Sequence, residues 1–265
     1  MMRYKILFIS LLVAVSQNVF PQAEDREITN VQTIGLGASN ILDTYLSQEK
    51  YNGMQLRYIS HTTRQPYELW SEVFIHQGIF SYAEPRSENN SEQMGMYIFD
   101  YGRYRDLRHD GNVRLRAGFL AEIGGGFLYN NSNTNNPAQG RLYLNVSPAV
   151  TGEWTFKLFN KWFTACYELS APLIGAMFSP NYGQSYYEIF SEGNYDHNVV
   201  FTTPFNAPSL RHSLALDIPM SKVSLRIGYL GDYQQAKVNN LKYHTYSHLL
   251  TIGVVKTFII HPLTR

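Results

Sequence analysis

Apolar and polar residues alternate along most of the chain with a period of two, which is typical of β-strands whose two faces meet different surroundings. The segment 141–158 is the clearest example, and the pattern recurs at 113–127 and 161–173. One face of 141–158 holds Leu142, Leu144, Val146, Pro148, Val150, Trp154, Phe156 and Leu158, and the other holds Arg141, Tyr143, Asn145, Ser147, Thr151, Glu153, Thr155 and Lys157. These segments predict strands with one apolar and one polar face.

The predicted strands are long. Strands of soluble proteins have about 5–6 residues, whereas a strand that crosses a membrane needs about 9–11. Strands are expected near 31–38, 53–63, 67–82, 94–106, 112–129, 140–158, 161–177, 208–218, 222–232 and 241–260. The sequence therefore predicts an all-β fold, a single antiparallel up-and-down transmembrane β-barrel of about ten strands. A count of twelve is the alternative, if 196–205 adds a further pair.

The connections between these strands are expected to alternate in length. Short ones are expected at 64–66, 107–111, 159–160 and 219–221, and longer ones at 39–52, 83–93, 130–139, 178–207 and 233–240. Barrels of the bacterial outer membrane have short periplasmic turns and longer outer loops. An even number of strands also predicts that both termini are periplasmic.

The N-terminus resembles a cleavable signal peptide. Arg3 and Lys5 precede an apolar stretch at 6–15 that is too short to span a bilayer. Residues 1–23 are therefore the expected signal peptide, and 24–265 the expected barrel domain. After residue 23 there is no apolar run of about 18 residues, so no helical membrane span is expected. Together with the strand pattern, this predicts location in the bacterial outer membrane.

Composition narrows the expected partners. Charged residues make up 16% of the chain, below the roughly 25% of soluble domains, and the net charge is +1. No basic face points to nucleic acid, so the expected partners are outer-membrane lipid and other envelope proteins. The chain has one cysteine, Cys166, and its histidines form no metal-ligand motif. No metal and no cofactor are predicted.

In a barrel of this kind the polar strand faces should line the lumen. The expected lumen charges are Arg57, Arg114, Arg116, Arg141, Lys157, Arg211, Arg226, Glu68, Glu72, Asp100, Glu122, Glu153, Glu168, Asp217 and Asp232. Positive and negative groups are nearly balanced in this set. A ten-strand barrel is only slightly wider than an eight-strand one, whose interior side chains fill. We therefore expect a lumen closed by an ion-paired network rather than a wide pore.

Several loop and strand-end segments resemble one known family. The segments are NILDTYLS at 40–47, SPNYGQSYYEIF at 179–190, DHN at 196–198, YLGDY at 229–233 and NNLKY at 239–243. Together they resemble an uncharacterised Bacteroidetes family, domain of unknown function 3316. The resemblance covers nearly all of the mature chain. It implies an outer-membrane barrel, and it implies no assigned activity and no catalytic residue.

Two groups of residues are candidates for function at the expected extracellular rim, because loops on a rigid scaffold tend to carry function. Asp43, Tyr186, Glu188 and Lys242 are candidate binding residues, unless the loops form a plug held by hydrogen bonds. Asp196, His197 and Asp232 are weak catalytic candidates, because a histidine acting as a general base needs a carboxylate to orient it. Adjacent residues rarely orient each other, so Asp196 alone is a poor partner for His197.

Three functions follow as hypotheses. The preferred one is an outer-membrane barrel with a closed lumen and a structural, assembly-partner or surface-binding role. The second is an outer-membrane hydrolase with a rim site around Asp196, His197 and Asp232. The third is a narrow channel for small solutes. Whether the protein is an enzyme stays open, although no complete catalytic constellation is present.

Overall fold

A computed structural model of the protein describes residues 26–67, 69–87, 90–131 and 136–260. The predicted signal peptide at 1–23 and the predicted lumen residue Glu68 lie outside these ranges. Among the described residues, no helix is both long and apolar enough to cross a membrane.

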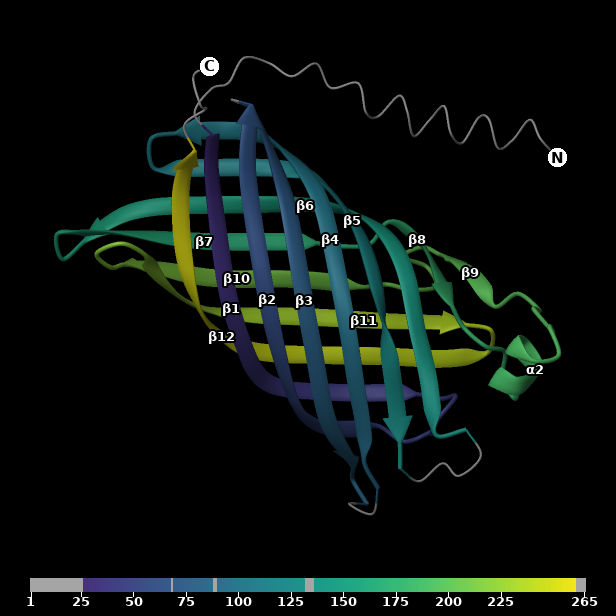
Figure 1. The fold of residues 1–265 in the computed structure, drawn as a ribbon. Coiled ribbons are helices and arrows are strands. Elements are labelled where there is room, and N and C mark those ends of the chain that lie inside the picture. The colour runs from purple at the N-terminus through teal and green to yellow at the C-terminus, as the bar shows by residue number, and fades with distance from the viewer. Residues whose placement is uncertain (1–25, 68, 88–89, 132–135, 261–265) are drawn as a thin grey trace, which may run out of the picture.

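The described chain folds into one antiparallel sheet and a short helix (Figure 1). Its elements are β1 (Arg26–Asp43), β2 (Tyr51–Tyr67), β3 (Trp70–Pro85), β4 (Glu92–Asp110), β5 (Val113–Asn130), β6 (Ala138–Leu158), β7 (Lys161–Ser170), β8 (Ile174–Phe178), α2 (Tyr186–Phe190), β9 (Val199–Thr202), β10 (Leu210–Pro219), β11 (Ser224–Val238) and β12 (Leu241–Ile260). The strands of the first half are far longer than those of a typical soluble domain, as the alternation predicts.

Ten of the strands close into a ring, which confirms the predicted barrel. Each strand from β1 to β6 pairs with the next, β7 pairs with β10, β10 with β11, β11 with β12, and β12 pairs back to β1. When the register is followed once around the ring, Leu142 of β6 leads back to Trp154 of the same strand. A stagger of that size over ten strands tilts them by roughly 40° to the barrel axis.

The alternative count of twelve is the number of strands in the whole sheet, whereas the ring itself contains ten. β8 pairs with β6 at Tyr143–Val146, and β9, which lies within the segment 196–205, pairs with β8. This short hairpin adds two strands without entering the ring. β7 and β8 together cover the single strand expected at 161–177, and the interruption between them falls at 171–173.

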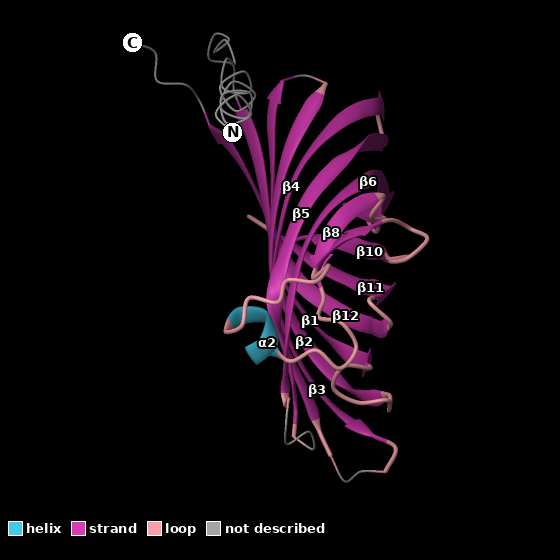
Figure 2. Cartoon of the chain, turned by 90° about the vertical axis from the view of Figure 1, so that its right-hand side faces the viewer, coloured by secondary structure: helices cyan, strands magenta, loops and turns pink. Residues whose placement is uncertain are grey.

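The two ends of the barrel differ, and we refer to them as the terminal end and the loop end. The terminal end carries residues 26 and 260, and the loop end carries α2, which lies outside the ring of strands (Figure 1, Figure 2). The prediction of a long loop at 233–240 is wrong. β11 continues to Val238, and only Asn239 and Asn240 form the turn, with φ of 50° and 60°. Asparagine tolerates this left-handed conformation, which two-residue hairpin turns require.

The two faces of the wall divide as expected. On β6, Leu142, Leu144 and Val150 are exposed on the outside, whereas Arg141, Asn145 and Ser147 are buried inside. The lumen is not polar throughout, however. Near the loop end, β1 to β5 and the loop between β1 and β2 bring nine buried apolar side chains together inside the ring, in a cluster with partly buried Tyr45 and Tyr143 packed against it. The lumen therefore has an apolar half toward the loop end.

Candidate functional site

A cluster of buried charges crosses the middle of the lumen, and we call it the central cluster. Arg211 of β10 reaches carboxylates on three other strands, one of them the adjacent β11. Its guanidinium nitrogens lie 2.8 Å from Glu122 on β5, 3.6 Å from Asp100 on β4 and 3.4 Å from Asp232 on β11. Because β10 and β4 lie on opposite sides of the ring, this one side chain connects walls that share no backbone pairing.

Arg57 of β2 provides the second cation of the central cluster. Its Nη1 lies 2.6 Å from Asp232 Oδ2 and donates to Gln77 Oε1 at 3.3 Å. Gln77 in turn donates to Asp100 at 3.0 Å. Arg57, Asp232 and Asp100 are each no more than 2% exposed. These contacts cross the lumen between β2, β3, β4 and β11.

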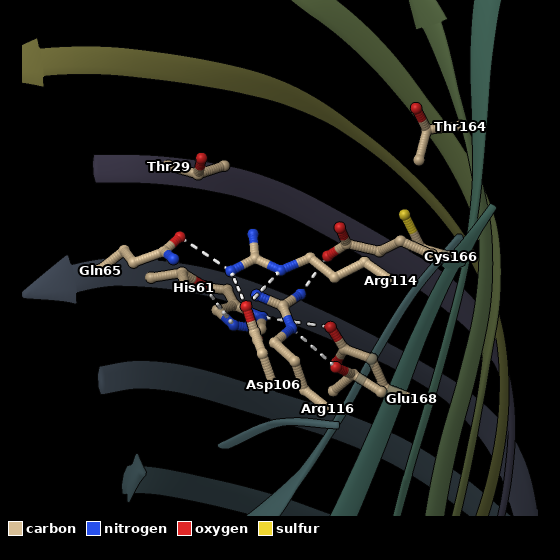
Figure 3. A network of polar contacts seen from close by, with 12 residues as sticks. Thr29, His61, Gln65, Asp106, Arg114, Arg116, Thr164, Cys166 and Glu168 are labelled. Carbon is tan, nitrogen blue, oxygen red and sulfur yellow. Dashed lines mark hydrogen bonds and ion pairs between the residues drawn. The ribbon is translucent and has the colours of Figure 1, made fainter. Parts of the chain in front are cut away.

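A second polar network lines the lumen at the terminal end (Figure 3). Arg114 contacts Asp106 at 2.7 Å and donates to Gln65 Oε1 at 2.8 Å. Arg116 pairs with Glu153, and His61 Nδ1 lies 3.8 Å from Glu168 Oε1. These groups come from β2, β4, β5, β6 and β7, so the network joins half of the ring.

Arg226 extends this network to the other half of the ring. Its guanidinium binds Asp217 of β10 through two nitrogens, at 2.6 and 2.8 Å. The thiol of Cys166, on neighbouring β7, lies 3.5 Å from Arg226 and 3.8 Å from Asp217. The cysteine thus fills space beside an ion pair that already has its partner.

The predicted lumen residues Arg57, Arg114, Arg116, Glu122, Glu153, Glu168 and Arg226 all face the lumen. Glu72 does not. Its neighbours Ser71 and Val73 are buried inside, so Glu72 points outward, beside Arg64 and Arg103 of the adjacent strands. β3 carries apolar residues on both faces, including Val73 inside and Phe74 outside, so its sequence does not reveal which face is inner.

The count of lumen charges also differs from the expected near-balance. Among the described residues, buried or partly buried charged groups inside the ring comprise six guanidiniums and nine carboxyl groups. They are Arg57, Arg114, Arg116, Arg141, Arg211, Arg226, Asp43, Glu92, Asp100, Asp106, Glu122, Glu153, Glu168, Asp217 and Asp232. Sequence reasoning missed Glu92 and Asp106 because both lie near strand ends, where the lumen face is hard to assign.

The rim candidates have separate partners. Asp43 is buried in an ion pair with Arg141, whose guanidinium lies 3.5 Å from the centre of the Tyr243 ring. Glu188 caps its own helix, and hydrogen bonds from the backbone N–H and hydroxyl of Ser185 lower the pKa of its carboxyl group. Lys242 is exposed, and only its backbone contacts Thr44. Asp43, Tyr186 and Glu188 all lie near Tyr45, but each is engaged in a different contact.

The segment 179–198, which contains α2, is bonded to three other parts of the loop end. Tyr186 accepts from Gly140 N at 2.6 Å and donates to Gln139 at 2.9 Å. Tyr45 donates to Gln184 O at 3.0 Å, and burial raises the pKa of the Tyr45 hydroxyl to about 12, so it remains a donor. Asn239 donates to the carbonyls of Ser179 and His197. The segment is therefore held as a fixed surface.

The catalytic candidates are not brought together. Asp196 Oδ1 lies 2.5 Å from His197 Nδ1, but both side chains are exposed, by 66% and 89%. Asp232 is instead buried in the central cluster, where Arg57, Arg211 and Gln234 are its partners. Asp196 and His197 do contact each other, against the expectation for neighbours. Their backbone carbonyls accept from the side chains of Asn181 and Asn239, which are not nucleophiles.

Comparisons with known proteins give a family and a set of distant structural similarities. Residues 4–264 match the model of the family described as "Protein of unknown function (DUF3316)". Among curated proteins, none matches this chain.

Three solved structures illustrate the structural similarities. The outer membrane protease OmpT from Escherichia coli has 9% identity and a TM-score of 0.46, with 91% of this chain and 99% of that one covered. The translocator domain of the autotransporter NalP from Neisseria meningitidis has 12% identity and a TM-score of 0.42, with 96% of each chain covered. The attachment invasion locus protein Ail of Yersinia pestis has 11% identity and a TM-score of 0.32, with 89% and 99% covered.

The central cluster makes Arg211 far more important to stability than an exposed arginine. Arg211→Met leaves three buried carboxylates with one fewer cation, and we expect a loss of about 3–5 kcal/mol in the free energy of unfolding. The matched control Arg108→Met removes an exposed pair with Asp110 and should cost about 0–1 kcal/mol. Denaturant unfolding of both variants in detergent measures the difference. Equal losses of unfolding free energy in the two variants would show that the buried carboxylates do not depend on Arg211.

Tyr186 should hold the segment 179–198 in place. Tyr186→Phe removes two hydrogen bonds worth about 0.5–1.5 kcal/mol each, so amide hydrogen exchange in this segment should accelerate by roughly 5- to 150-fold. Tyr187→Phe changes the exposed neighbour and should leave exchange unchanged. Hydrogen exchange read by mass spectrometry compares the two. If both variants exchange like the parent protein, the segment does not depend on this contact.

Proposed function

The chain belongs to the DUF3316 family of proteins of unknown function, and we propose that it is an integral protein of the bacterial outer membrane with a closed lumen and a surface-binding role. The observation that carries the membrane location is the outer face of the ring. Apolar side chains of every barrel strand point outward, among them Leu36, Leu56, Phe80, Phe119 and Leu144, each at least half exposed.

This outer face suits acyl chains and not water. Contiguous exposed apolar patches on soluble monomers rarely exceed a few hundred Å². A bilayer core offers backbone N–H and C=O groups no water to bond with. The closed ring pairs these groups between neighbouring strands instead. With the longer connections at the loop end, that end is the extracellular one in this proposal, and the terminal end is periplasmic.

The closed lumen argues for a role other than conduction. The buried ion pairs of the central cluster cross the middle of the barrel, and freely conducting porins have about 16–18 strands rather than ten. The loop end instead offers a fixed surface with exposed aromatic side chains, namely Tyr182, Tyr187, Phe190 and Tyr195. Aromatic side chains held in place lose little entropy on binding and are frequent binding hot spots. Other envelope molecules are the proposed partners.

The membrane location predicts a position-dependent effect of charge on the outer face. Leu144→Arg places a cation in the middle of the apolar band and should cost about 2–4 kcal/mol of unfolding free energy in lipid vesicles. Leu158→Arg, at the terminal end of the same strand, should cost about 0–1 kcal/mol. Refolding in vesicles with denaturant titration measures both. A protein outside the membrane would instead tolerate both exposed arginines alike.

The surface role predicts contacts at the loop end of the protein in cells. A photo-crosslinking phenylalanine analogue at Tyr187 should give adducts with other envelope molecules after illumination of intact cells. The same analogue at Phe159, which is 86% exposed at the opposite end, is the matched control for adducts formed by chance. Absence of adducts at Tyr187, or an identical set from both positions, would contradict the surface role.

A further inference from the structure

Three arginines lie on the outer face of the barrel near its terminal end. Arg64 of β2 and Arg103 and Arg105 of β4 are exposed, and the residues on either side of each face the lumen or are buried there. Glu72 of β3 lies directly across from both Arg64 and Arg103 in the register. This part of the outer face therefore carries three cations and one carboxylate among the described residues, a surplus of positive charge.

Arg103 and Arg105 are free to bind an anion. Across residues 26–67, 69–87, 90–131 and 136–260, neither of them forms a salt bridge. The guanidinium of Arg103 lies 5.4 Å from the centre of the Trp70 ring, and such stacking leaves its edge N–H groups able to donate. Because Arg103 and Arg105 are two residues apart on one strand, roughly 7 Å, both side chains can reach one phosphate group.

An open groove of about 790 Å³ begins at these two arginines and crosses the outer face from β4 to β7. This volume is within the range of roughly 300–1,000 Å³ found for small-molecule sites. Beyond the arginines, the outward side chains of β4, β5 and β6 that line the groove are Tyr101, Leu107, Ala117, Phe119, Ala121, Val146, Pro148 and Val150. Apart from its charged end, the groove is therefore apolar.

The register makes the arginines and the apolar lining one continuous surface. Arg105 lies across from Ala117, and Ala117 lies across from Val150. Ala121 and Val146 are paired with each other in the middle of β5 and β6, whereas the arginines are near the terminal end of β4. The groove thus has its charged end at the edge of the apolar band and its apolar end within the band.

The two ends of the groove match the two parts of a phospholipid. Arginine binds phosphate oxygens through paired N–H donors, and the apolar lining suits an acyl chain. Trp70 and Tyr101, which border the arginines, are residue types that collect at the boundary between membrane and water. The surplus of positive charge favours an anionic headgroup, because a zwitterionic one brings a cation of its own.

We propose that this groove binds an anionic phospholipid of the periplasmic leaflet. Its phosphate is held by Arg103 and Arg105, and one acyl chain lies along Ala117, Ala121 and Val150. The proposal rests on the membrane location proposed above, and it adds a specific lipid site to a surface that otherwise contacts lipid without selection.

The test uses the mature protein refolded into vesicles of phosphatidylcholine and phosphatidylglycerol in a fixed ratio. One preparation carries a diazirine on an acyl chain of the phosphatidylglycerol, and the other carries it on the same chain of the phosphatidylcholine. After illumination, fragmentation mass spectrometry assigns adducts to residues, and the ratio of phosphatidylglycerol to phosphatidylcholine adducts is compared between positions. The reference position is Leu250 of β12, which is 75% exposed and lies across the ring from β5.

The ratio at Ala121, Val146 and Val150 should be roughly 5- to 25-fold higher than at Leu250, since each arginine near a membrane surface favours anionic lipid by about fivefold. Equal ratios in the groove and at Leu250 overturn this inference but leave the membrane location standing. Absence of adducts at all four positions overturns the membrane location itself.

Substitutions of single cations supply the matched control. Arg103→Gln and Arg105→Gln should each lower the ratio in the groove by about fivefold. Lys256→Gln removes an exposed cation at the same end of the barrel, on β12, and should leave the ratio in the groove unchanged. Heat-modifiable migration on a gel confirms that each variant has refolded. A ratio that is unchanged in both refolded arginine variants overturns the proposal.

Filling the groove tests where the acyl chain lies. Ala121→Phe places a ring in the apolar part and should bring the ratio at Val146 and Val150 down to the value at Leu250. Ala38→Phe, at an exposed position on β1, should change neither. A high ratio that persists in refolded Ala121→Phe overturns the placement of the chain in this groove.

Discussion

The contacts of Arg57 and Arg211 with carboxylates across the lumen are the interaction on which the rest of this structure depends. A ten-strand ring places polar side chains from opposite walls within reach of one another, where water is largely excluded. Arg211 alone contacts carboxylates from three other strands. Because buried charges need partners, the walls can be polar inside only if these contacts form together.

The central cluster also divides the lumen into two unlike halves. Toward the terminal end, arginines and carboxylates pair around a polar cavity. Toward the loop end, methionine, isoleucine and leucine side chains line the inside, and the wall beside them is interrupted.

Much of the fold could be predicted from the sequence, because alternation fixes both strand type and strand face. Along 141–150 of β6 the more buried and the more exposed positions alternate as the pattern predicts. The prediction fails where both faces are apolar, as at Glu72 on β3, and where two polar residues make a turn inside a long pattern, as at Asn239 and Asn240. The site was harder to predict. Sequence patterns identify the lumen charges, but the stagger between strands decides which of them meet. Asp232, for example, contacts Arg211 and not His197.

Planar-bilayer recording tests the closed lumen most directly. The refolded protein should insert and give a flat current trace at background conductance. A variant with both Arg57→Ala and Asp232→Ala removes one ion pair of the central cluster without leaving either charge alone, and it should insert and leak. Leak from the variant shows that a flat trace from the parent protein reflects closure and not failed insertion. Stable conductance steps from the parent protein would contradict a lumen closed by the central cluster.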